Sequence, residues 1–251
     1  MATSEACARI PPVSSDYKPI GRYDTVAGFK TYITGSEDAK RAIIDVYDVF
    51  GVTPQTLQGA DRLAAQTNSL VLVPDFFRGR AAQHDWFPAD TPEKREALTR
   101  LVNEVANNGV VNDAIAVRAE IARRWPAVDD HVGIFGLCFG GKIAVLATGE
   151  GNVGPGRKFN VSGAAHPGRL DAKDAEVLTV PHICLASKDE PADVVAHIKE
   201  ILSKPGKVGH VETYDTFHGW MGARADLNVE AQRNEYARGY DQVAEFFNKY
   251  L

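Results

Sequence analysis

Two kinds of hydrophobic pattern alternate along the chain. Short apolar runs rich in β-branched residues predict buried strands, and longer segments with apolar residues every three or four positions predict amphipathic helices. The predicted strands are residues 29–33, 42–47, 70–74, 131–136, 161–166, 182–187 and 208–214. Helical periodicity fills most of the intervals between these runs.

Two helical segments are the most regular. Residues 111–125 place Val117 and Ile121 on one face before a proline, and the C-terminal segment does the same with Tyr240 and Phe247. Strand followed by helix, repeated, predicts an α/β fold whose mostly parallel central sheet is flanked by helices on both faces. No internal repeat, low-complexity tract or long linker divides the chain, so we expect a single domain over residues 1–251.

Composition narrows the classes of function. The 251 residues are 44% hydrophobic and carry a formal net charge of −5, which argues against nucleic-acid or anionic-membrane partners. Neither a membrane span nor a targeting segment is evident, so we expect a cytoplasmic protein. Cys7, Cys138 and Cys184 are far apart and form no disulfide framework or C-x-x-C pair. We therefore expect reduced thiols, no metal, no cofactor, and either a monomer or a homodimer.

The stretch GIFGLCFGGKIAV, residues 133–145, allows two interpretations. Read from Gly136 it is a phosphate-binding G-x-x-x-x-G-K loop, but the next residue is Ile143, which offers no hydroxyl to Mg²⁺. Centred on Cys138 it is a G-x-C-x-G nucleophile elbow, in which Gly136 and Gly140 provide the room that a sharp strand-to-helix turn needs. The alternative is that Cys138 is only a small buried residue in a close-packed turn.

Acidic and histidine candidates follow in the order expected of α/β-hydrolases, which is nucleophile, acid, histidine. Asp189 follows the predicted strand 182–187, and His218 follows the predicted strand 208–214. Glu190 and Asp193 compete for the role of the acid, and an acidic residue after a strand is often only a helix cap. We interpret the remaining histidines as structural.

These residues together resemble the dienelactone hydrolase family of α/β-hydrolases. The resemblance is carried by Gly136–Gly141, by Asp189 and by Phe217–Trp220, and it extends to Asp48–Gly51 and Pro74–Gly79. It implies a Cys-His-Asp triad, Cys138–His218–Asp189, that hydrolyses lactones or activated esters through an acyl-cysteine. It also implies an acidic residue near the thiol that governs the resting state of the thiol. Asp48 stands at this position, where the family has Glu.

The resemblance also implies groups that bind the substrate. Backbone amides of Val49 and Phe139 are expected to hold the oxyanion of the reacting carbonyl. Aromatic and arginine side chains near the motifs are expected to contact a small lactone or ester, in particular one that bears a carboxylate. The residues predicted for this role are Phe50, Arg78, Arg80, Trp220 and Arg224.

Three other functions remain open from the sequence. A thioesterase or polyketide-processing hydrolase would use the same site, because a thioester presents the same carbonyl to the thiolate. A nucleotide-binding phosphotransferase depends on Lys142 alone. A non-catalytic receptor for a small ligand would keep the fold without the chemistry.

Overall fold

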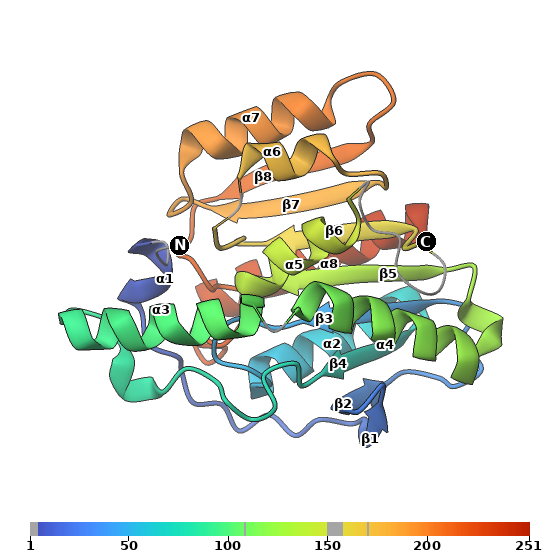
Figure 1. Cartoon of the computed structure of the whole chain (residues 1–251), viewed down its shortest axis with the longest axis horizontal. Helices are drawn as coiled ribbons and strands as arrows, with labels where there is room; N and C mark the ends of the chain where they lie inside the picture. Colours follow the sequence, from blue (N-terminus) through green and yellow to red (C-terminus); the bar gives the residue numbers. More distant parts are fainter. Residues whose placement is uncertain (1–4, 108, 150–157, 170) are drawn as a thin grey trace.

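The computed structural model describes residues 5–107, 109–149, 158–169 and 171–251. Eight strands form one sheet in the order β1-β2-β4-β3-β5-β6-β7-β8 (Figure 1). The strands are β1 (Arg22–Val26), β2 (Phe29–Thr34), β3 (Ala42–Val46), β4 (Leu70–Pro74), β5 (Val132–Leu137), β6 (Val161–Ala165), β7 (His182–Ser187) and β8 (Gly209–Tyr214). Strands β3 to β8 run parallel, whereas β2 is antiparallel to both β1 and β4.

Helices cover both faces of the sheet. They are α1 (Glu5–Arg9), α2 (Pro54–Thr67), α3 (Pro92–Asn107), α4 (Val110–Arg124), α5 (Phe139–Ala147), α6 (Ala172–Glu176), α7 (Ala192–Leu202) and α8 (Glu230–Tyr250), with 3₁₀ turns at His84–Trp86 and Pro126–Val128. Helix α2 packs against α8, and α4 packs against α5. On β6, Gly163 lies against Phe247 of α8, whereas the next residue, Ala164, lies against Gly141 of α5. Because successive strand residues point to opposite faces, α5 and α8 lie on opposite sides of the sheet.

The predicted α/β-hydrolase architecture is confirmed, and each predicted strand agrees with an observed strand to within one residue. The central strands β3 to β7 are buried along their whole length, which explains their continuous apolar runs. Strand β1 was not predicted. It lies at the sheet edge, and four of its five residues are exposed, so it has no apolar run to detect.

The carboxyl ends of the parallel strands meet at one edge of the sheet. Helix α1 lies beside this edge, although it is the first element of the chain (Figure 1). In α/β proteins this edge is where ligands bind, because the loops that follow the strands converge there. None of the described helices is both long and apolar enough to span a membrane.

Candidate active site

Cys138 occupies the sharp turn between β5 and α5. Its φ of 51° and ψ of −109° are unfavourable for a residue with a side chain. A Cβ added to Gly136 would collide with the backbone of Gly140, and one added to Gly140 would collide with the carbonyl of Val46. The two glycines are therefore required by the turn, as expected of a nucleophile elbow. The turn holds the Cys138 sulfur at the N-terminal end of α5, among amides that lack helical partners.

His218 lies between this sulfur and a carboxylate. Its Nε2 is 3.1 Å from the Sγ of Cys138, and its Nδ1 is 2.6 Å from Oε1 of Glu190. The loops after β5, β7 and β8 supply the three side chains. Cys138 and His218 are each only 1% exposed, so the contacts are shielded from water. A thiol, an imidazole and a carboxylate in this order can transfer a proton from sulfur and stabilise the resulting imidazolium.

The acid beside the imidazole is Glu190 and not Asp189, which corrects the residue chosen from the sequence. Asp189 instead accepts a hydrogen bond from the backbone N–H of His218 at 2.9 Å. Glu190 turns back under the end of β7, where it accepts hydrogen bonds from the backbone N–H and the hydroxyl of Ser187. Its longer side chain thus reaches the ring, while the shorter one orients the loop that carries the ring.

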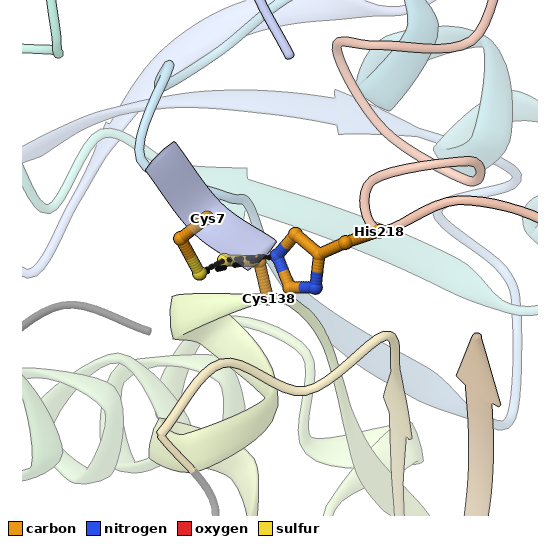
Figure 2. Close-up of side chains that lie close together, drawn as sticks. All are labelled: Cys7, Cys138 and His218. Atoms are coloured by element: carbon orange, nitrogen blue, oxygen red, sulfur yellow. Dashed lines mark hydrogen bonds between the residues drawn. The ribbon is translucent and has the colours of Figure 1, made fainter. Parts of the chain in front are cut away.

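Cys7 is part of this site, and no sequence pattern pointed to it. Its Sγ is 3.4 Å from the Sγ of Cys138 and 3.2 Å from Nε2 of His218 (Figure 2). Cys7 belongs to α1, and it is 4% exposed. It is 131 positions away from Cys138 in the chain and belongs to no motif, so only the tertiary structure could reveal the contact.

The second thiol changes the ionisation of the site. The hydrogen bond with Cys7, burial and the charge of Asp48 all raise the pKa of Cys138, whereas the Arg224 guanidinium opposes them. Burial alone would lower the pKa of His218, but Cys7 and Glu190 raise it to about 9. Both sulfurs face the same ring nitrogen of His218, so the three groups titrate together.

Arg224 is the predicted arginine that reaches the site. It is 1% exposed, donates from Nη2 to the carbonyl of Cys7 at 2.6 Å, and donates from Nε to the carbonyl of Ile10 at 2.5 Å. Its guanidinium also lies 4.9 Å from the ring centre of Phe50 and 5.5 Å from that of Phe87. Through these two hydrogen bonds, Arg224 holds the N-terminal segment over the site.

The other two predicted arginines do not converge with Arg224. Arg78 donates to the carbonyl of Gly28 and lies over the ring of Phe29, and Arg80 forms a long, exposed ion pair with Glu104. These contacts attach the loop after β4 to the β1–β2 turn and to α3. The expectation that they bind the substrate therefore has no support in the geometry.

The two predicted aromatic residues have different surroundings. Phe50 is buried against Phe87 and Arg224, next to the N-terminal segment, so it belongs to the wall of the site. Trp220 stacks on Tyr214 with ring centres 4.3 Å apart and packs against Gly239 of α8. Trp220 is thus a core residue behind the His218 loop, which corrects its prediction as a substrate contact.

Asp48 is fully buried at the end of β3. Its carboxylate accepts from the backbone N–H of Phe50 at 2.9 Å and from that of Ala223 at 3.1 Å. Burial raises the pKa of Asp48, while Arg224 and the two amides act in the opposite direction.

Val49 and Phe139, whose amides are predicted to hold the oxyanion, lie on two adjacent segments. Val49 follows Asp48 on the loop after β3, and Phe139 begins α5 directly after Cys138. The loop and the elbow touch, because Gly140 lies against the carbonyls of Val46 and Tyr47.

A cavity of about 250 Å³ adjoins the site between α1 and α7. Its lining residues come from α1, the loop after β6 and the start of α7, and include Ala6, Arg9, Arg169, Asp189 and Glu190. The cavity reaches the acid beside His218 from outside.

Among the described residues, Cys7, Cys138 and His218 form a group that could hold a metal ion. Their donor atoms all lie within 4.8 Å of one another. Two deprotonated thiols and a neutral imidazole suit a soft divalent cation, but the buried Arg224 cation beside them opposes one.

Comparison with known proteins identifies the family of the chain. The model of the dienelactone hydrolase family matches residues 29–251. An uncharacterized AIM2 family protein of Schizosaccharomyces pombe is 31% identical, with 91% of this chain and 90% of that protein covered. A carboxymethylenebutenolidase homolog of Mus musculus is 26% identical, with 94% of each chain covered. The crystal structure of a putative dienelactone hydrolase from Klebsiella pneumoniae has a TM-score of 0.71 at 18% identity, with 92% of this chain and 99% of that one covered.

Proposed function

Because the chain belongs to the dienelactone hydrolase family and is thus an ester or lactone hydrolase, we propose that it acts through a Cys138–His218–Glu190 triad and an acyl-cysteine intermediate. The observation that carries the proposal is the unbroken series of contacts from the Cys138 sulfur through both ring nitrogens of His218 to Glu190. The strained elbow adds support, since such strain is concentrated at functional sites.

Each group has one role in the proposed reaction. His218 takes the proton of Cys138, the resulting thiolate attacks the carbonyl carbon, and the amides of Phe139 and Val49 stabilise the oxyanion. The imidazolium of His218 gives its Nε2 proton to the leaving alkoxide, and the acyl group stays on sulfur. His218 then takes a proton from water, which attacks the thioester and releases the acid. Glu190 holds the imidazole in one tautomer throughout.

We infer that substrates are small lactones or activated esters, preferentially with a carboxylate. A thiolate leaves a tetrahedral intermediate easily, so the oxygen leaving group must be activated to compete with it. Arg224 supports the carboxylate preference, since it is buried in the site and already binds two carbonyl oxygens of the N-terminal segment. A substrate carboxylate could replace those carbonyls with charge-assisted bonds.

The proposal is tested by comparing the native chain with Cys138→Ala on a panel of enol lactones, aryl esters and thioesters. We expect kcat/KM for lactones and aryl esters to fall about a thousandfold or more in Cys138→Ala. Intact-mass analysis of the quenched native enzyme should show the acyl group, and peptide mapping should locate it on Cys138. Cys184→Ala, which removes a buried thiol of β7, is the matched control and should keep the native rate.

Two results would contradict the proposal. One is turnover by Cys138→Ala near the native rate, and the other is an acyl group mapped to a residue other than Cys138. A native preference for thioesters over every lactone and ester would keep the triad but replace the proposed substrate class.

A further inference from the structure

The two sulfur atoms of the site touch each other. The Sγ atoms of Cys7 and Cys138 are 3.4 Å apart, and the two side chains point toward each other in Figure 2. Ester hydrolysis by the triad requires only one of these thiols. The second thiol therefore needs an explanation that the hydrolytic mechanism does not provide.

Cys7 is held against the nucleophile by its backbone. Arg224 binds the carbonyls of Cys7 and Ile10, and the carbonyl of Ala8 accepts a hydrogen bond from the N–H of Ala89 at 2.8 Å. A further backbone hydrogen bond joins Val13 to Ala223 at 2.8 Å. These bonds place the first described turn of the chain across the site, so the contact between the sulfurs is built into the packing of α1.

His218 contacts both thiols. Nε2 of His218 lies 3.2 Å from one sulfur and 3.1 Å from the other, so a proton can move from either thiol to the ring. A disulfide has an S–S bond of about 2.05 Å, so the sulfurs need to approach by little more than an ångström. Rotation of the Cys7 side chain with a small shift of the five-residue helix α1 can provide this.

We propose that Cys7 is a resolving thiol for Cys138, so that the nucleophile is a site of reversible oxidation by hydroperoxides. Thiolates react with peroxides, and cysteines that sense oxidation commonly lie next to a second cysteine. This inference does not require Cys138 to hydrolyse esters, because it depends only on the reactivity and position of the two thiols.

The proposed reaction has two steps. His218 takes the proton of Cys138, and the resulting thiolate attacks the distal oxygen of a hydroperoxide. The O–O bond breaks, and the alkoxide takes the proton from His218 and leaves as an alcohol. Cys7 then gives its proton to His218, and its thiolate attacks the sulfenic sulfur of Cys138. The S–S bond forms, the S–O bond breaks, and the leaving hydroxide takes the proton from His218 to become water. In total, two thiols lose two protons and two electrons to the hydroperoxide, which becomes one alcohol and one water.

The disulfide would have two consequences. It would remove the nucleophile and fix α1 over the site, so that hydrolysis stops. It would also keep Cys138 from further oxidation to the sulfinic acid, which ordinary thiols cannot reverse. Reduction by a dithiol would restore both sulfurs.

The test treats the native chain with hydrogen peroxide in the presence of EDTA and dimedone. We expect a loss of about 2 Da, a Cys7–Cys138 disulfide in non-reducing peptide maps, little dimedone adduct, and full recovery by dithiothreitol. Cys7→Ser should instead accumulate the dimedone adduct on Cys138, because no thiol can displace the sulfenic oxygen. Cys184→Ala should behave as the native chain does.

The proposal is overturned if the native chain and Cys7→Ser form the dimedone adduct or the sulfinic acid of Cys138 at the same rate. It is also overturned if the oxidised native chain lacks the Cys7–Cys138 peptide pair. If Cys7→Ser does not fold, Cys7→Ala and the native peptide map give the same decision. All of these readouts measure the oxidation products of the cysteines, so they do not depend on whether the chain hydrolyses esters.

Discussion

Two adjacent acidic residues hold different parts of His218. Glu190 contacts the ring at Nδ1, whereas Asp189 contacts only the backbone N–H. We expect Glu190→Gln to lower kcat/KM by roughly 10²–10⁴, because the amide still reaches the ring but cannot stabilise the imidazolium. Asp189→Asn should lose less than about tenfold, since the amide oxygen still accepts from the N–H. A larger loss in Asp189→Asn than in Glu190→Gln would assign the acid to Asp189.

The charge of Asp48 acts on the Cys138 thiol. Its carboxylate contributes to the raised pKa of Cys138, so its removal should lower that pKa. We expect Asp48→Asn to shift the pH profile of Cys138 alkylation by iodoacetamide towards lower pH, as measured by peptide mass mapping. An unchanged profile would mean that Asp48 acts only by accepting hydrogen bonds from Phe50 and Ala223.

At the scale of elements, α1 covers the candidate active site. Because Cys7 and the Arg224 contacts lie over a nucleophile that is 1% exposed, substrate entry requires α1 to move. We expect a variant lacking residues 1–9 to react with iodoacetamide at Cys138 about tenfold or more faster than Cys7→Ala, which lacks the same thiol but keeps α1. Equal rates would show that α1 does not control access to Cys138.

The elbow depends on the contact between α5 and the end of β3. A Cβ at position 140 would collide with the carbonyl of Val46, so Gly140→Ala must push α5 away from the sheet. We expect this change to lower the free energy of unfolding by at least about 2 kcal/mol in urea titrations. Leu146→Ala, at an exposed position of the same helix, should cost much less. Similar losses for the two variants would indicate that the turn relaxes easily.

At the scale of the whole molecule, stability should depend on a carboxyl group in the centre of the sheet. Asp45 is the fourth of the five residues of β3, is fully buried, and has no hydrogen-bond partner for its carboxyl group among the described residues. Burial, followed by the charge of Asp48, raises the pKa of Asp45 to about 8. The folded chain therefore keeps a proton there that the unfolded chain releases near pH 4.

The sign of the pH dependence follows from linkage. Between about pH 4 and pH 8 the folded state binds more protons than the unfolded state at Asp45, so its contribution to stability falls as pH rises. Asp45→Asn removes the titrating carboxyl group and with it this loss of stability at high pH. We expect its free energy of unfolding to exceed that of the native chain at pH 8, by on the order of 5 kcal/mol, and to differ little at pH 4. A constant difference between the two pH values would exclude titration of Asp45 as the cause.

The sequence by itself determined the buried strands, the turn at Cys138 and the position of His218. Each of these follows from a local pattern, namely apolar runs in fully buried parallel strands, glycines around a strained turn, and a histidine after a strand that ends at the site. The exposed edge strand β1 lacks such a pattern, so it was missed.

Only the tertiary structure decided which side chains meet at the site. Asp189 and Glu190 are adjacent in the chain, and the path of the loop after β7 decides which carboxylate reaches the ring. Arg224 binds the N-terminal segment, and Cys7 joins the site from the opposite end of the chain, because α1 folds back over the carboxyl edge of the sheet. Local patterns carry no signal for such contacts, since they depend on packing between segments far apart in the sequence.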